Sequence, residues 1–152
     1  MKKTTKIYAG YINLKPINGV IFPSYAQNQV NKEFINNKLN GQFFMTTNEN
    51  MYGENSIILR SLIKEKSING IVMLSTFCLP ENIGKRIKIY KMLKKFRKSI
   101  HFIFEELNYN SQSINIDEIE MYLMFDNNFF TQKKISLSRQ ENQFIDKTWQ
   151  FI

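Results

Sequence analysis

Short apolar runs alternate with longer amphipathic segments along this chain, and that alternation most restricts how it can fold. Strand-like runs cover residues 7–13, 42–46, 71–74 and 100–104, with a helical segment in each interval. This order is typical of parallel strands joined by crossover helices. We therefore predict an α/β fold, a three-layer α/β/α arrangement with a short, mainly parallel sheet of four to five strands.

The helical segments begin at Ser24, near residue 55 and near Pro80, and each has apolar residues at helical spacing. The S-x-x-Q spacing of Ser24 and Gln27 predicts a capping box at the start of the first helix. The Asn69-Gly70 pair predicts a turn. The expected core positions are Ala26, Val30 and Phe34 in the first helix, Ile58, Leu59, Leu62 and Ile63 in the second, and Ile83, Ile87, Tyr90 and Leu93 in the third.

The 152 residues fit one domain, with a β-α-β-α-β-α-β core over 1–107 and a C-terminal extension over 108–152. Residues 108–115 read as a polar loop. Residues 118–125 fit a short helix or a strand, since apolar runs of that length are ambiguous. A terminal helix is expected over 136–151.

Cys78 and His101 are the only cysteine and histidine. We therefore expect no disulfide within the chain and no metal site, and a Ser-His-Asp triad would have to use His101. The sequence has neither a glycine-rich dinucleotide fingerprint nor a Walker loop, so no cofactor is predicted.

The formal net charge is +8, which suits nucleic acid, anionic lipid or phosphorylated ligands as partners. The heavy use of Lys, Asn and Ile is also what AT-rich coding produces, and the lysines at 85, 88, 91 and 95 read as one solvated helix face. No apolar run approaches the ~18 residues of a membrane helix, and no signal-peptide core follows the first lysines. We predict a cytoplasmic protein.

Ligands of open parallel sheets bind outside the carboxyl ends of the strands. That rule selects residues 13–23, 46–50, 75–80 and 105–106. Lys15 and the helix start at Ser24 could hold an anion, since helix N-termini attract negative charge. The candidate pocket residues are Lys15, Ser24, Gln27, Asn28 and Ser75, with Glu49 and Glu105 as candidate catalytic acid–base groups.

Each candidate also has a purely structural interpretation. Ser24 and Gln27 can act only as a cap, and Glu49 can be a solvated loop carboxylate. The Ser75 hydroxyl can satisfy nearby backbone. His101 and Cys78 read as packed side chains.

The order of elements resembles the catalytic domain of serine recombinases (resolvases). Residues 10–15, Gly-Tyr-Ile-Asn-Leu-Lys, stand where that family has its G-Y-A-R-V-S-type motif. Lys15 takes the place of the nucleophilic serine and Asn13 that of the arginine. Residues 75–80 lack the Asp-Arg pair of the second motif, so the resemblance implies the fold only.

A second set of motifs resembles the sporadic carbohydrate cluster proteins of bacteria. The matching positions are Gly10, Tyr11, Pro16, Gly19, Pro23, Gln27 and Asn28, the Thr46-Thr47-Asn48-Glu49 loop, residues 70–80, Arg86, Ile89 and Tyr90, and residues 100–105. The resemblance covers about residues 8 to 107. It adds Tyr11 and Thr47 to the expected ligand-binding residues.

This resemblance implies a role in surface polysaccharide (lipopolysaccharide or capsule) biosynthesis, acting on or binding a nucleotide sugar or sugar phosphate. It implies no particular reaction. Two alternatives stay open, a non-catalytic partner of a biosynthetic enzyme, and a resolvase-like nucleic-acid-binding protein, which we regard as the weaker. A homo-oligomer is compatible with either role.

Overall fold

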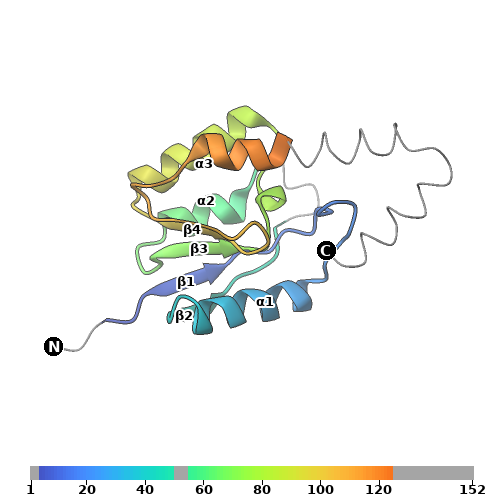
Figure 1. Ribbon diagram of the computed structural model, residues 1–152. Coiled ribbons are helices and arrows are strands. Elements are labelled where there is room, and N and C mark those ends of the chain that lie inside the picture. The colour runs from blue at the N-terminus through green and yellow to red at the C-terminus, as the bar shows by residue number, and fades with distance from the viewer. Residues whose placement is uncertain (1–3, 50–54, 125–152) are drawn as a thin grey trace.

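The computed structural model describes residues 4–49 and 55–124, which form three layers (Figure 1). In chain order the elements are β1 (Ile7–Gly10), α1 (Ser24–Asn37), β2 (Gln42–Met45), α2 (Ile57–Lys64), β3 (Gly70–Met73), the short 3-10 helix η1 (Thr76–Cys78), α3 (Ile83–Lys95), β4 (Ser99–Phe102) and β5 (Leu107–Tyr109), followed by a helix over 116–124. α1 covers one face of the sheet, and the other helices cover the opposite face.

The sheet has five strands in the order β2-β1-β3-β4-β5. The first four strands run parallel, and β5 pairs antiparallel with β4. All four predicted strands are present, and the α/β class with a mainly parallel sheet is confirmed. β1 is shorter than expected because the chain leaves the sheet after Gly10, although the Tyr11 amide still donates to the Val72 carbonyl at 2.8 Å.

The main apolar core lies between the sheet and the layer of α2, α3 and the 116–124 helix. β3 is buried at all four positions, as expected of a strand covered on both faces. In α2 the predicted positions are correct, since Leu59, Leu62 and Ile63 are buried and Ile58 packs against them. Burial of such side chains contributes about 1.5–3 kcal/mol each, so this layer supplies most of the driving force for folding.

α1 turns a polar face to the sheet, and the predicted core positions of this helix are wrong in part. Its buried residues are Gln27, Asn31 and Ile35, whereas Val30 is 39% exposed. The apolar spacing misleads because Gln27 and Asn31 hydrogen-bond to the carbonyl groups of the chain that leaves β1. Phe34 is only partly buried.

The predicted core positions of α3 are correct in its second half, at Tyr90 and Leu93, and wrong in its first half. Ile83 and Ile87 are 57% and 38% exposed, and the buried residues are Ile89, Tyr90 and Leu93. The inward face includes Arg86, whose guanidinium pairs with a carboxylate of the 116–124 helix. That ion pair, and not the apolar repeat, fixes the rotation of the first turn.

The Asn69-Gly70 pair is not a turn of its own. Gly70 is buried and begins β3, and a Cβ there would lie 1.9 Å from the Ser99 hydroxyl oxygen and 2.9 Å from the Tyr8 ring. The glycine is needed because side chains of the neighbouring strands β1 and β4 meet over it.

The C-terminal part differs from its expected form. Residues 107–109 pair as β5, within what reads as the start of a polar loop, and 116–124 form a helix, which was one of the two alternatives. Ile119 and Leu123 of this helix are buried in the main core. The helix predicted over 136–151 lies outside the described residues.

Candidate functional site

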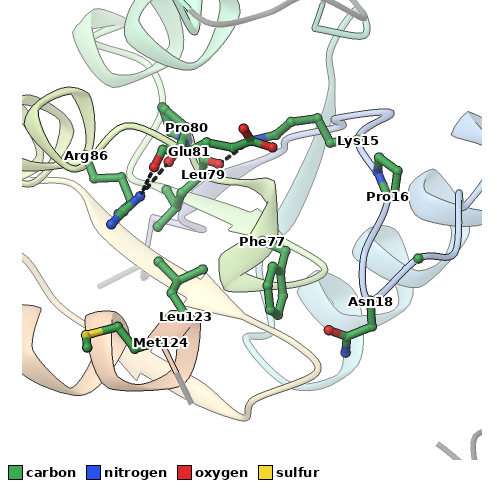
Figure 2. Close-up of a pocket in the computed structure, with 11 residues that line it drawn as sticks. Lys15, Pro16, Asn18, Phe77, Leu79, Pro80, Glu81, Arg86, Leu123 and Met124 are labelled. Carbon is green, nitrogen blue, oxygen red and sulfur yellow. Dashed lines mark hydrogen bonds between the residues drawn. The ribbon is translucent and has the colours of Figure 1, made fainter. Parts of the chain in front are cut away.

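A pocket of about 510 Å³ lies beyond the carboxyl ends of the parallel strands, and we call it the Lys15 pocket (Figure 2). It is lined by Lys15, Pro16, Asn18, Gly19, Phe77, Leu79, Pro80, Glu81, Arg86, Leu123 and Met124. These residues come from the loop after β1, the η1–α3 connection, α3 and the 116–124 helix. Two of the four predicted segments, 13–23 and 75–80, therefore meet at this pocket.

Lys15 supplies a cation to one wall of this pocket. Its Nζ donates to the Leu79 carbonyl oxygen at 2.5 Å, which uses one of its three N–H donors. Burial lowers the pKa of Lys15, and the nearby carboxylate of Glu81 partly opposes that effect. The ammonium is thus partly desolvated and retains donors for a ligand.

The loop beside Lys15 is a tight turn. Ile17 and Val20 exchange two backbone hydrogen bonds of 2.8 and 3.0 Å, and Asn18 and Gly19 between them both have positive φ. This is the backbone of a type I′ turn, for which Asn-Gly is the preferred pair. The pocket wall contributed by Asn18 and Gly19 is therefore formed before any ligand arrives.

Glu49 follows β2, and its carboxylate is used in holding the fold together. The side chain is 3% exposed and accepts hydrogen bonds from the Tyr11 hydroxyl at 2.9 Å and from the amides of Ile58 and Leu59 at 3.1 and 3.2 Å. It thereby caps α2 from another loop. The loop carboxylate is buried, so its interpretation as a solvated group is wrong. Burial, together with this carboxylate, raises the pKa of Tyr11.

The capping box expected at Ser24 and Gln27 is absent. Pro23 is the N-cap, and no side chain caps the helix there. Ser24 instead accepts from Asn48 Nδ2 at 2.6 Å, and Gln27 Nε2 donates to the carbonyls of Asn13 and Phe22 at 2.9 and 2.8 Å. The two side chains are free to anchor neighbouring loops because the helix begins at Ser24 itself, one residue earlier than a capping Ser24 would require.

Asn28 and Thr47, two further predicted binding residues, do not line the Lys15 pocket. Within residues 4–49 and 55–124, Asn28 Oδ1 is buried and has no hydrogen-bond partner, and the same holds for Gln27 Oε1 and Asn31 Oδ1. Thr47 is exposed.

Ser75 and Glu105 form a second polar group at the ends of β3 and β4. Glu105 accepts from the Thr76 amide at 2.7 Å and from the Ser75 hydroxyl at 3.3 Å, and the Ser75 oxygen accepts from the Phe77 amide. Both side chains hold the start of η1. Ser75 thus satisfies nearby backbone, as its structural interpretation expects.

Arg86, which lines the pocket, forms a partly buried polar cluster with Tyr90 and Glu120. Arg86 binds both carboxylate oxygens of Glu120 at 2.8 Å, and the Tyr90 hydroxyl donates to the same carboxylate at 3.0 Å. The Arg86 Nη1 also donates to the carbonyls of Pro80 and Glu81. Arg86 therefore links the 116–124 helix to the Pro80-Glu81 segment of the pocket wall.

His101 and Cys78 are packed side chains in this structure. His101 is 6% exposed, with Nδ1 2.8 Å from Asn108 Oδ1 and Nε2 3.0 Å from the Ser99 hydroxyl. Burial lowers the pKa of His101, and burial raises the pKa of the Cys78 thiol to about 11. The raised pKa of the Cys78 thiol disfavours the thiolate that nucleophilic chemistry needs.

Among residues 4–49 and 55–124, no cluster of three His, Cys, Asp or Glu side chains could hold a metal ion. Over the same ranges no helix has the length and apolar character needed to cross a bilayer. A comparison with protein-family models gives no match, and a search of curated proteins gives none. The resemblance to sporadic carbohydrate cluster proteins therefore stays a prediction from the motifs.

Of the nine predicted site residues, only Lys15 lines the pocket. The sequence did not single out Glu81, Phe77 or Glu120 for a role. Arg86 and Tyr90 do belong to the carbohydrate-cluster motif and stand four residues apart, which places both on one helix face. That spacing was a usable signal for Arg86 and Tyr90, but their partner Glu120 lies outside the motif region.

Proposed function

We propose that this chain binds a small anionic carbohydrate, a sugar phosphate or nucleotide sugar, in the Lys15 pocket, in the service of surface polysaccharide biosynthesis. The observation that carries the proposal is the partly desolvated Lys15 ammonium on the wall of a pocket of about 510 Å³ at the carboxyl edge of the sheet. Small-molecule sites typically occupy about 300–1,000 Å³ and lie at this edge in open α/β sheets.

The other pocket residues suit a sugar attached to the anion. The Glu81 carboxylate beside Lys15 accepts hydrogen bonds only, so it matches sugar hydroxyl groups. Phe77 and Leu79 offer apolar surface to the ring face (Figure 2). A phosphoryl oxygen would then bind the Lys15 ammonium, and the sugar hydroxyl groups would donate hydrogen bonds to the Glu81 carboxylate.

Binding is the activity that the geometry supports. Glu49 and Glu105, the predicted acid–base residues, do not line the Lys15 pocket, and each carboxylate accepts hydrogen bonds from backbone amides. A catalytic role for either carboxylate remains a separate prediction. The surface-polysaccharide context rests on the motif resemblance alone.

Calorimetry of the full chain with a panel of sugar phosphates, nucleotide sugars and uncharged sugars tests this function. We expect saturable binding by at least one charged member, weakened about tenfold or more by Lys15→Ala, which loses a charge-assisted hydrogen bond. Lys38→Ala on the distant end of α1 is the matched control and should bind as the wild type does. Absence of binding at millimolar concentration, or full binding by Lys15→Ala, would refute the proposal.

A further inference from the structure

A second, smaller pocket of about 120 Å³ lies between the first turns of α2 and α3, and we call it the Ser56 pocket. It is lined by Asn55, Ser56, Arg60, Pro80, Lys85, Lys88 and Ile89. Pro80 also lines the Lys15 pocket, so the η1–α3 connection separates the two. Its volume is well below the ~300 Å³ of the smallest usual ligand sites, which limits an occupant to one small group.

The lining of the Ser56 pocket is strongly basic. Among the residues that the structure describes, its lining includes Arg60, Lys85 and Lys88 and no acidic side chain. In the part of the chain that the structure describes, none of these three side chains has an ion pair or a hydrogen bond, whereas Arg86 nearby is paired with Glu120. Like charges gathered without a counter-ion repel one another, and an anion between them would relieve that repulsion.

Ser56 provides an independent sign of a missing partner. Its side chain is 2% exposed, and its buried hydroxyl oxygen has no hydrogen-bond partner among the residues that the structure describes. Ser56 is the N-cap of α2, but its hydroxyl does not cap because Glu49 already binds the amides of Ile58 and Leu59. A buried hydroxyl left unpaired costs about 1–3 kcal/mol, so native structures rarely keep one without a use.

We propose that the Ser56 pocket is a binding site for a single phosphate group, as inorganic phosphate or a phosphomonoester. The Ser56 hydroxyl turns about its one side-chain torsion to donate to a phosphate oxygen. Arg60, Lys85 and Lys88 neutralise the charge of the phosphate. The α2 amides are occupied by Glu49, so the side chains carry recognition. This site is separate from the Lys15 pocket and does not depend on the carbohydrate proposal.

Titration of the full chain with inorganic phosphate, followed by calorimetry at constant ionic strength in chloride, tests the site. We expect saturable binding with a millimolar or lower dissociation constant. The Lys85→Gln/Lys88→Gln double variant should weaken it about tenfold or more, and Ser56→Ala about fivefold. Lys91→Gln/Lys94→Gln removes the same charge from the exposed part of α3 and should stay within about twofold, because salt screens distant charges.

Three results would overturn the proposal: no saturable phosphate binding, equal weakening by the two double lysine variants, or loss of phosphate binding in Lys15→Ala with full retention in Lys85→Gln/Lys88→Gln. The last result would place the anion in the Lys15 pocket. Arg60→Gln, an exposed change, provides a second probe if Ser56→Ala does not fold. Sugar-phosphate binding that survives Lys85→Gln/Lys88→Gln separates this site from the proposed function.

Discussion

Glu49 shows how a residue that looks free in the sequence becomes structural. Its carboxylate replaces Ser56 as the cap of α2 and receives the Tyr11 hydroxyl from the end of β1. One side chain thus links the carboxyl edge of the sheet to the start of the helix that covers it. Nothing in local spacing reveals this, because the partners lie 9 to 38 residues away.

We expect Glu49→Gln to lower the free energy of unfolding by about 2 kcal/mol, since hydrogen bonds to a charged group contribute about 1.5–3 kcal/mol. Tyr11→Phe removes the hydroxyl that donates to Glu49. In a double-mutant cycle followed by urea unfolding, the coupling free energy between Tyr11→Phe and Glu49→Gln should be about 1 kcal/mol. Glu33→Gln on the exposed side of α1 is the control, with a change below about 0.5 kcal/mol. A Glu49→Gln effect as small as the control would show that the carboxylate is not structural.

His101 makes stability depend on pH near neutrality. Burial lowers its pKa below the ordinary value of about 6.5, so the unfolded chain binds more protons between the folded pKa and that value. The stabilisation is present above pH ~6.5 and is lost as pH falls through the folded pKa. Urea unfolding from pH ~7.5 to ~5.5 should show this fall, and His101→Gln should flatten it.

Nuclear magnetic resonance gives a direct check, because the chain has a single histidine. The imidazole proton signal should titrate below pH ~6.5 in the folded protein. A titration midpoint at or above the ordinary histidine value would contradict the expected direction.

At the scale of elements, sequence patterns predicted where helices lie better than how they face. The alternation of runs located β1 to β4 and α1 to α3, because backbone propensity and the spacing of apolar residues are local properties of the sequence. The predicted inward faces of α1 and of the first half of α3 were wrong because polar side chains occupy inward positions, whereas Tyr90 and Leu93 of α3 were predicted correctly. Gln27 and Asn31 reach strand-end carbonyls, and Arg86 reaches Glu120, and these partners exist only in the folded chain.

The end of α3 contains a residue that its backbone does not favour. Arg97 has φ of 56°, and the amides of Arg97 and Lys98 donate to the carbonyls of Lys94 and Leu93, which is a Schellman motif with arginine at the glycine position. Left-handed backbone costs a residue with a side chain about 1 kcal/mol relative to glycine.

Arg97→Gly should therefore raise the free energy of unfolding by about 1 kcal/mol, measured by urea or thermal denaturation. Arg97→Ala is the matched control, because it also removes the guanidinium but keeps the backbone penalty. If both variants shift stability equally, the effect belongs to the side chain and not to the backbone.

At the scale of the whole molecule, the close packing of β1, β3 and β4 depends on the absence of a side chain at Gly70. The Ser99 hydroxyl from β4 and the Tyr8 ring from β1 both lie over this position in β3. Local sequence suggested only a turn at Asn69-Gly70, since the need for glycine comes from strands that are distant in the chain.

Gly70→Ala should destabilise the protein by about 2 kcal/mol through overpacking, as followed by chemical denaturation. Ser99→Ala removes the nearest atom, so Gly70→Ala/Ser99→Ala should lose less than the sum of the single variants. An additive double variant would mean that the Tyr8 ring, or the backbone, sets the limit.

The carboxyl edge of the sheet could be located from the sequence. The sequence did not reveal which of its polar side chains line the pocket and which hold the loops in place. The order of strands predicted that residues 13–23 and 75–80 would meet, and both line the Lys15 pocket. Hydrogen bonds among the loops decide which polar side chains face that pocket. Gln27, Glu49 and Glu105 make such bonds elsewhere and do not line it.

The polar underside of α1 has a consequence for how the molecule opens. α1 buries one apolar side chain fully, Ile35, and leaves Gln27 Oε1 and Asn31 Oδ1 without partners, whereas α2 buries three apolar side chains in the main core. Segments with little apolar burial unfold locally at lower free energy than the core. Native-state hydrogen exchange in low urea should release the α1 amides before those of α2. Identical opening free energies would mean that α1 and α2, on the two faces of the sheet, unfold only together.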